Sequence, residues 1–286
     1  MRSIAGSDSG GGAGIQADLK AFAACGVHGM TAITAITAQN TKGVSAVEAI
    51  SPEIIVAQVK AVAEDIGVDA VKIGMLGTVA TIEAVAAALD LLAPGTPVVL
   101  DPVMVSESGS ELLEATARGA LIELLLPRVR VITPNLPEAR ALAAAASAAW
   151  PPSVAAASAA AAASAAAATA AAPDTAAGGD DAAMLARVLH AVGPEVVVVT
   201  GGHREQAVDV FFDGAEVVEL PGERYPGGAA HGSGCTHSSV LAARLAWGDP
   251  PLEAAREAKR LASQAVRDGL AGVGEGAGPV NVLGVS

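Results

Sequence analysis

The chain has 286 residues, and its 30 acidic and 17 basic side chains give a formal net charge of −13. Because no block of Lys or Arg interrupts this acidic balance, nucleic acid and anionic membrane surfaces are excluded as expected partners. The two cysteines, Cys25 and Cys235, fit neither a disulfide framework nor a zinc site, and the N-terminus lacks the apolar stretch of a signal peptide, so a cytoplasmic protein is expected.

Short apolar runs alternate with Ala-rich segments along most of the chain. Predicted strands cover 29–37, 69–75, 97–103, 128–135 and 195–202, and predicted helices include 52–66 and 81–92. The strands are continuously apolar, which is typical of a parallel sheet covered on both faces, and the alternation predicts a doubly wound α/β fold. The runs within 207–225 alternate more and are separated by Asp-Gly, so they are expected to form an antiparallel hairpin at the sheet edge.

The segment from about 141 to 181 is nearly all Ala with scattered Ser, Thr and Pro. A membrane span is rejected because Ala barely favours insertion and the Trp-Pro-Pro at 150–152 breaks the run. We expect a low-complexity insertion, part helix and part disordered, with a lid over the functional site as the alternative. The whole chain, 1–286, is then one domain that carries this insertion.

Residues with chemical potential follow several predicted strands. Gln39 follows the run at 29–37, Met75 ends the next among glycines, and Asp101, Asn135 and Glu138 follow two more. Ligands of open parallel sheets bind beyond the carboxyl ends of the strands, so this recurrence predicts one composite site. Each residue alone also has an ordinary explanation, such as a turn cap, a solvated amide or a first-turn Glu facing the helix dipole.

Two glycine-rich segments precede predicted helices. Gly10–Gly14 matches neither a Walker sequence nor a dinucleotide-binding motif and is a weak signal. Gly232, Ser233 and Gly234 stand at a helix start, where backbone N–H groups converge into an anion hole. The same helix dipole is expected to lower the pKa of the Cys235 thiol. Three roles stay open for this cysteine: a nucleophile with a neighbouring histidine as base, a general base for a substrate hydroxyl, or an inert residue.

Eight motifs occur in the order seen in one enzyme family. They are AGSDSGGGAGIQADLK, TAITAQNT, IGML, DPVMVSESG, TPNLPEA, GGH, HGSGCT and GEGAGPVN. Through them the sequence resembles the hydroxymethylpyrimidine and hydroxymethylpyrimidine phosphate kinases of thiamine biosynthesis, members of the ribokinase-like superfamily, everywhere except in the Ala-rich insertion. The resemblance implies a three-layer α/β/α sandwich with a mostly parallel central sheet and an antiparallel edge hairpin, usually assembled as a homodimer.

The resemblance also implies a reaction and a substrate pocket. The reaction is ATP- and Mg²⁺-dependent phosphorylation of 4-amino-5-hydroxymethyl-2-methylpyrimidine and then of its monophosphate, giving the diphosphate. By motif match, Gln39 hydrogen-bonds the aminopyrimidine edge. Ala13, Met75 and Val103 line the ring pocket.

The remaining motif residues are implied to handle phosphate and proton. Asn135 and Glu138 resemble the superfamily's N-x-x-E element, which organises Mg²⁺ and phosphate, with Asp101 nearby as a second candidate metal ligand. The amides of 232–234 form the anion hole. Cys235 stands where sugar kinases of the superfamily carry an Asp base, which favours a proton-accepting role over a nucleophilic one.

Three departures from the family keep rival functions open. Thr200 stands where the family usually has Lys, so a phosphate contact is expected to be missing; the first strand is short, which indicates a truncated start; and the insertion replaces a short helical connection. Pyridoxal kinase, alone or as a dual activity, is the first rival. A catalytically silent pyrimidine-binding protein is the second. A cysteine-dependent hydrolase is the weakest, because it leaves Asn135 and Glu138 unexplained.

Overall fold

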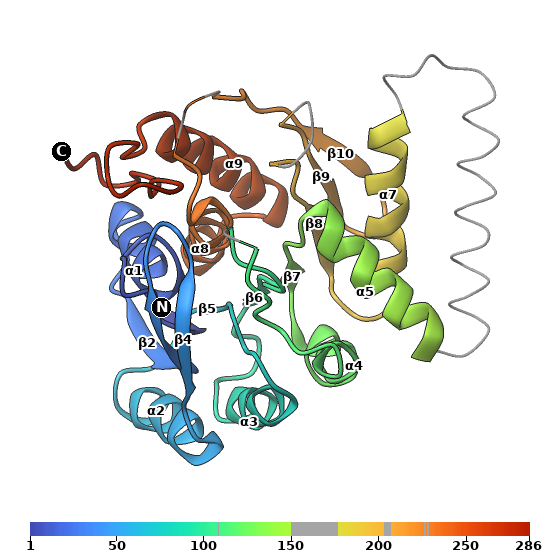
Figure 1. Cartoon of the computed structure of the whole chain (residues 1–286). Coiled ribbons are helices and arrows are strands. Elements are labelled where there is room, and N and C mark those ends of the chain that lie inside the picture. The colour runs from blue at the N-terminus through green and yellow to red at the C-terminus, as the bar shows by residue number, and fades with distance from the viewer. Residues whose placement is uncertain (108, 150–176, 203–206, 226, 228) are drawn as a thin grey trace.

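The computed structural model describes residues 1–286 except 108, 150–176, 203–206, 226 and 228 (Figure 1). Among the described residues, eight strands form one sheet in the order β10-β9-β8-β7-β6-β5-β1-β2, and β3 and β4 form a separate hairpin. The strands are β1 Arg2–Ala5, β2 Met30–Ile33, β3 Ala35–Gln39, β4 Val44–Ala49, β5 Val71–Ile73, β6 Val98–Leu100, β7 Val131–Ile132, β8 Val196–Val199, β9 Asp209–Phe212 and β10 Val217–Leu220.

Helices and short helical turns connect these strands. The α-helices are α1 Gly14–Ala24, α2 Pro52–Asp65, α3 Val79–Leu89, α4 Ala117–Ala120, α5 Leu136–Ala149, α7 Ala177–His190, α8 Ser233–Ala246 and α9 Pro251–Arg267. A π-helical turn, η1 Leu121–Leu125, and a 3₁₀ turn, η2 Leu126–Arg128, follow α4. Of the helices that the structure describes, none is long and apolar enough to cross a membrane.

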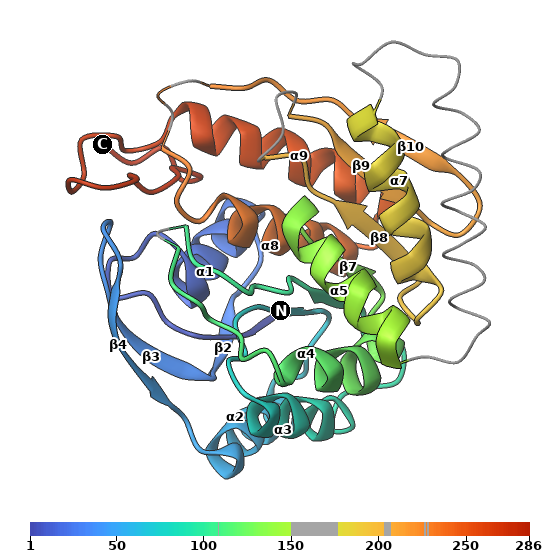
Figure 2. The same cartoon turned by 45° about the vertical axis from the view of Figure 1, so that its right-hand side comes forward.

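The main sheet is parallel from β2 through β8, and β9 and β10 extend it as an antiparallel edge. Figures 1 and 2 show helices on both faces, with α1, α8 and α9 on one side and α2, α3, α4, α5 and α7 on the other. The predicted three-layer sandwich with an antiparallel edge hairpin is therefore confirmed.

Two apolar cores lie on the two faces of this sheet. In β6, Val98 and Leu100 pack into the core shared with α2, α3, α5 and α7, whereas Val99 packs into the core shared with α1, α8 and α9. All three side chains are buried. Since residues of both pleat faces lose contact with water, the strands read as continuous apolar runs rather than alternating ones.

The predicted strand at 29–37 is wrong in one respect, because it is two strands. Thr34 separates β2 from β3, and its hydroxyl donates to the backbone oxygen of Met75 at 2.7 Å. After this bend the chain pairs with β4 in an antiparallel hairpin outside the main sheet. Ala35 and Thr37 are buried while Ile36 is exposed, and this alternation is typical of a half-buried strand.

The Ala-rich segment begins and ends in helices. α5 runs to Ala149 and α7 starts at Ala177, and the residues between them lie outside the described part of the chain. Arg140 of α5 forms an ion pair with Asp181 of α7, so the two helices pack against each other. The predicted helical part of the insertion is present at both ends, and the predicted disorder falls on residues that are not described.

Arg2 is a charged residue inside the sheet. It lies on β1, which pairs with β2 and β5; its side chain is fully buried, and burial lowers the pKa of its guanidinium to about 10. One nitrogen donates to Thr31, but Nε and Nη1 have no partner among the described residues. A buried charge with unsatisfied donors destabilises the folded state.

We therefore expect Arg2→Leu to raise the free energy of unfolding by about 1–3 kcal/mol, since an apolar side chain removes the unpaired donors. Urea denaturation with an unchanged slope measures this effect. Arg2→Lys keeps a buried charge and is the matched control, expected to bring no gain. A less stable Arg2→Leu protein would contradict the prediction.

Candidate active site

The motif residues meet at the carboxyl edge of the sheet. Met75 and Asp101 follow β5 and β6, Asn135 follows β7, and Ala13 follows β1 at the start of α1. Val103 lies three residues beyond the end of β6, and its amide donates to the backbone oxygen of Asp101 at 2.9 Å. The sequence predicts that these residues lie on one edge of the sheet. In the structure, β7, β6, β5 and β1 are neighbours in the sheet, so the ends of these strands lie side by side.

The glycine-rich turn before α1 is wrapped around a carboxylate of its own. Asp8 is 1% exposed, and it accepts hydrogen bonds from the amides of Gly10 (2.8 Å), Gly12 (3.0 Å) and Ala13 (2.8 Å). Nε2 of His231 lies 2.9 Å from the same carboxylate. The amides that a ligand anion would need are thus already used inside the protein.

The anion hole predicted from the sequence would lie at the start of α8. Gly232 caps the helix with φ +85°, and a β-carbon there would lie 1.8 Å from the backbone oxygen of Gly12. Only glycine fits such a position. Ser233 and Gly234 follow in the first helical turn, where the helix dipole is positive, but the Ser233 amide already donates to the backbone oxygen of Ala230 at 3.0 Å. The amide of Ser233 is therefore not free in this structure, and an anion hole at 232–234 stays a prediction.

Cys235 lies in this first turn, but its thiol differs from the expectation. Burial raises the pKa of the Cys235 thiol to about 12, and the nearby carboxylates of Asp18 and Asp101 act in the same direction. The Lys72 ammonium and the backbone amide of Gly14 favour the thiolate without outweighing burial. At neutral pH the resting protein carries a thiol, so the predicted lowering of the pKa is wrong.

A buried ion pair lies beneath the anion hole. Nζ of Lys72 lies 2.8 Å from Asp18 and 4.0 Å from Asp101, and the side chains of Lys72 and Asp18 are inaccessible to water. Burial alone would lower the pKa of Lys72, but the surrounding negative groups outweigh it and raise the pKa. Ser239 donates to Asp18, and Ser238 donates to Asp101 at 3.0 Å.

Asn135 and Glu138 form a reciprocal cap at the start of α5. The Asn135 side chain accepts from the Glu138 amide at 2.9 Å, and the Glu138 carboxylate accepts from the Asn135 amide at 2.9 Å. The other carboxylate oxygen accepts from the Met104 amide. Burial raises the pKa of Glu138 to about 7, and the charge of Asp101 adds to the shift.

Gln39 is fixed on the hairpin beside the glycine-rich turn. Its backbone amide donates to the Ser9 hydroxyl at 2.8 Å, and its side-chain oxygen accepts from the Thr37 hydroxyl at 3.2 Å. Met75 packs on the other side of this turn, where a β-carbon on Gly6 would lie 2.5 Å from its terminal methyl group. Both predicted pocket residues therefore flank the segment that leads from β1 to α1.

Sequence comparisons identify the family of this chain. The model described as phosphomethylpyrimidine kinase matches residues 8–172 and 165–281. A relative from Rhizobium meliloti strain 1021, named hydroxymethylpyrimidine/phosphomethylpyrimidine kinase, is 46% identical over 283 residues, which cover 98% of this chain and 95% of the relative. The chain belongs to the phosphomethylpyrimidine kinase family.

Solved structures agree with this membership. A phosphomethylpyrimidine kinase from Clostridium difficile 630 is 38% identical with a TM-score of 0.71, and the match covers 93% of this chain and 98% of that one. A pyridoxal kinase from Staphylococcus aureus in complex with AMP-PCP is 29% identical with a TM-score of 0.79, and the match covers 98% and 92% of the two chains. The neighbours thus include a kinase with a bound ATP analogue.

In this member of the phosphomethylpyrimidine kinase family, the structure also shows ion pairs and hydrogen bonds near the site that involve residues not predicted from the sequence. Asp8, Asp18 and Lys72 were not singled out, although a lysine inside an apolar strand is a visible signal of a buried partner. His231 and His237 are both buried: His231 pairs with Asp8, and Nε2 of His237 lies 3.3 Å from Asp209. His203 lies outside the described residues.

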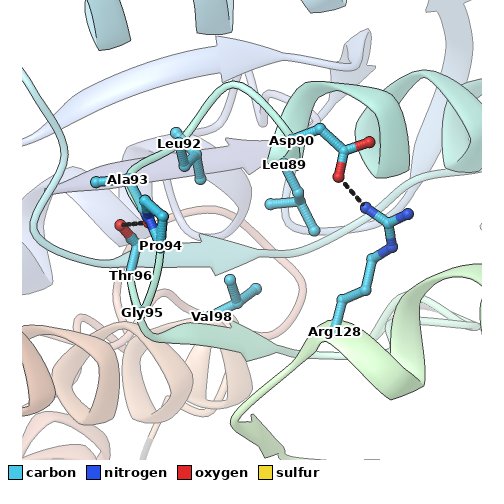
Figure 3. A pocket seen from close by; sticks show the side chains of 9 residues that line it. All are labelled: Leu89, Asp90, Leu92, Ala93, Pro94, Gly95, Thr96, Val98 and Arg128. Carbon is cyan, nitrogen blue, oxygen red and sulfur yellow. Dashed lines mark hydrogen bonds and ion pairs between the residues drawn. The ribbon is translucent and has the colours of Figure 1, made fainter.

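Two pockets lie away from the residues above. One, of about 490 Å³, lies between the end of β10 and α9, and its basic lining residues are Arg256, Lys259, Arg260 and Arg267. We call it the basic pocket. The other, of about 310 Å³, lies at the amino end of β6, where Arg128 reaches Asp90 (Figure 3). This second pocket is at the opposite end of β6 from Asp101.

Proposed function

We propose that this chain is an ATP-dependent kinase that phosphorylates 4-amino-5-hydroxymethyl-2-methylpyrimidine and then its monophosphate to the diphosphate, in thiamine biosynthesis. Membership of the phosphomethylpyrimidine kinase family supports this reaction. The structural observation that carries it is the convergence of the acidic residues Asp101 and Glu138 with the amide-lined start of α8 at one sheet edge. Phosphoryl transfer mainly requires this kind of positioning and charge stabilisation.

The pyrimidine is proposed to lie against the turn between β1 and α1. Gln39 would hydrogen-bond the aminopyrimidine edge, and Ala13, Met75 and Val103 would line the ring. The location of Met75 against Gly6 and of Gln39 against Ser9 supports this arrangement. The hydroxymethyl group would then face Cys235.

ATP is proposed to direct its phosphates to the anion hole at 232–234. The basic pocket supports this direction, because Tyr225 in its wall precedes Gly232 by a short stretch of sequence and its lining carries four cationic side chains. Each of the four is paired with a carboxylate of the chain, so a polyphosphate would have to share or replace those partners. Thr200, whose amide donates to Pro134, lies beside Asn135 where the family's Lys is missing.

A magnesium ion fits the acidic pair near this site. Glu138 and Asp101 are both buried, and the charge of Asp101 raises the pKa of Glu138 after the larger effect of burial. Two carboxylates that repel each other favour a cation between them. Among the described residues no group of three metal-ligating side chains occurs, which suits Mg²⁺ held by one or two carboxylates together with substrate phosphates. When bound, the ion would neutralise charge on the transferring phosphoryl group.

Glu138→Gln is expected to raise the Mg²⁺ concentration for half-maximal activity about 10-fold or more, the scale on which loss of a metal-site partner is felt. The amide oxygen of Gln still accepts one backbone N–H, so the start of α5 is largely kept. Titration of activity against Mg²⁺ measures the shift. The control is Glu53→Gln, which changes an exposed first-turn Glu of α2 and should leave the Mg²⁺ dependence as it is.

A cytoplasmic homodimer is part of the same proposal. The hairpin of β3 and β4 exposes Ile36 and Val47, each 52% accessible, and apolar side chains of this kind favour association with a second copy. Sedimentation velocity tests the dimer. The net charge of −13 supports the absence of a nucleic-acid partner.

The deciding experiment is ATP consumption by the purified protein with Mg²⁺ and hydroxymethylpyrimidine, with mono- and diphosphate products resolved. Diphosphate formation supports the two-step kinase and shows that Thr200 is tolerated. Pyridoxal is tested in parallel, because the structural neighbours include a pyridoxal kinase solved with pyridoxal. Pyridoxal turnover comparable with that of the pyrimidine would establish the dual activity. Pyrimidine binding without ATP consumption would favour the silent binding protein.

A further inference from the structure

Asp8 joins two segments that are far apart in the sequence. Its Oδ1 accepts from the Gly10 amide, and its Oδ2 accepts from the amides of Gly12 and Ala13. The same Oδ2 lies 2.9 Å from Nε2 of His231. Burial alone would raise the pKa of Asp8, but the hydrogen bonds from His231 and from the Ala13 and Gly10 amides outweigh burial and lower the pKa. The carboxylate is therefore ionised and fully occupied.

The first of these segments reaches the reacting group. It ends at Gly14, whose backbone amide donates to the sulfur of Cys235. Gly14 has φ +55°, and a β-carbon there would lie 2.4 Å from the backbone oxygen of Gly6, so the turn has little room for adjustment. A shift of the amides that Asp8 holds would move Gly14 relative to Cys235.

The second segment leads into the anion hole. His231 directly precedes Gly232, and its backbone amide and oxygen are bonded to Gly278 and Val280 of the C-terminal segment. Its ring lies against Gly12, where a β-carbon would meet the ring at 2.2 Å. Through its contact with Asp8, the His231 ring thus holds the start of α8 in a fixed location relative to the turn before α1.

We propose that Asp8 is a positioning residue for phosphoryl transfer, holding the ring-pocket turn and the anion hole in one fixed relation through His231. This inference rests on the proposed kinase function. Misplacement of reacting groups by about 1 Å costs on the order of 10²-fold in rate. The residue acts through its neighbours, because its own oxygens are occupied by the protein.

Asp8→Asn replaces one acceptor oxygen by a donor and breaks part of this set of contacts while keeping the shape. We expect kcat to fall about 10- to 100-fold, the range of a charged hydrogen bond. Calorimetry is expected to show weaker hydroxymethylpyrimidine binding. Asp213→Asn is the matched control: Asp213 also accepts two backbone amides, from Ala215 and Glu216, in the exposed turn between β9 and β10. It should leave both quantities unchanged.

Variants of His231 distinguish a positioning role of Asp8 from a general loss of folding, because His231 contacts Asp8 directly. His231→Gln places a donor near the location of Nε2 and is therefore expected to retain a higher kcat than His231→Leu. This comparison tests the inference even if Asp8→Asn fails to fold, because both variants keep Asp8. Combining Asp8→Asn with His231→Leu should cost little beyond either alone. Additive losses, or kcat within about twofold of the parent in folded Asp8→Asn, would overturn the inference. If the parent consumes no ATP, the proposed function fails, and pyrimidine affinity decides: unchanged affinity in Asp8→Asn overturns the positioning role, and weaker affinity supports it.

Discussion

Lys72→Met is expected to lower the free energy of unfolding by about 3–5 kcal/mol, the cost of leaving a buried charge without its partner. Asp18 is inaccessible to water and would keep only its hydroxyl partners, Ser3 at 2.5 Å and Ser239 at 2.8 Å. Asp101 would lose the same neighbouring cation. Because the folded protein has a raised Lys72 pKa, the stabilisation by the charged Lys72 is fully present below the unfolded pKa of about 10.4 and is lost only as the pH rises through the folded pKa. The difference in free energy of unfolding between the parent and Lys72→Met is therefore expected to be fully developed at neutral and mildly alkaline pH.

Chemical denaturation at neutral pH measures this loss, and an exposed ion pair provides the control. Lys60 pairs with Glu64 one helical turn away on α2, and both side chains are more than half exposed. Lys60→Met should change stability by less than about 0.5 kcal/mol. Removing both buried charges with Lys72→Met and Asp18→Asn is expected to recover part of the loss. Equal effects of Lys72→Met and Lys60→Met would contradict the buried-pair account.

The sheet and its functional edge were predictable because they depend on local patterns. Continuous apolar strands, separated by helices, indicate a parallel sheet, and the rule that ligands bind at the carboxyl ends placed Asp101 and Asn135 together. The hairpin of β3 and β4 was missed because the break at Thr34 depends on a hydrogen bond to Met75, a residue distant in the sequence. A contact between residues that are far apart in the sequence cannot be predicted from the local residue pattern.

The candidate site was less predictable where several distant groups act on one atom. The predicted lowering of the Cys235 pKa depends only on the helix dipole in the first turn of α8. In the folded protein the thiol is also desolvated and lies near Asp18 and Asp101, which reverse the sign of the shift. Similarly, the sequence of the glycine-rich turn does not reveal that Asp8 occupies three of its amides. Burial and long-range pairing decide both cases.

Cys235→Ala is expected to lower kcat about 10²-fold while leaving the KM for the pyrimidine within about twofold. General base catalysis contributes about 10²–10⁴-fold, and the lower end applies because the thiol is mostly protonated at neutral pH. The Lys72 ammonium nearby favours the thiolate, which is the form of Cys235 that can take the proton from the substrate hydroxyl and becomes the thiol when it does so. A late proton transfer suits phosphoryl transfer, which makes only a modest demand on the base.

The pH profile of kcat separates this role from mere packing. Since burial raises the pKa of Cys235 to about 12, the thiolate fraction rises about tenfold per pH unit at any lower pH. The parent is therefore expected to gain rate with pH from neutral into the alkaline range, and Cys235→Ala is expected to lose that slope. Cys235→Ser keeps the size of the side chain with a far less acidic group, so it should resemble Cys235→Ala. An unchanged rate in Cys235→Ala would exclude the base role, and a flat parent profile would exclude the thiolate as the proton acceptor.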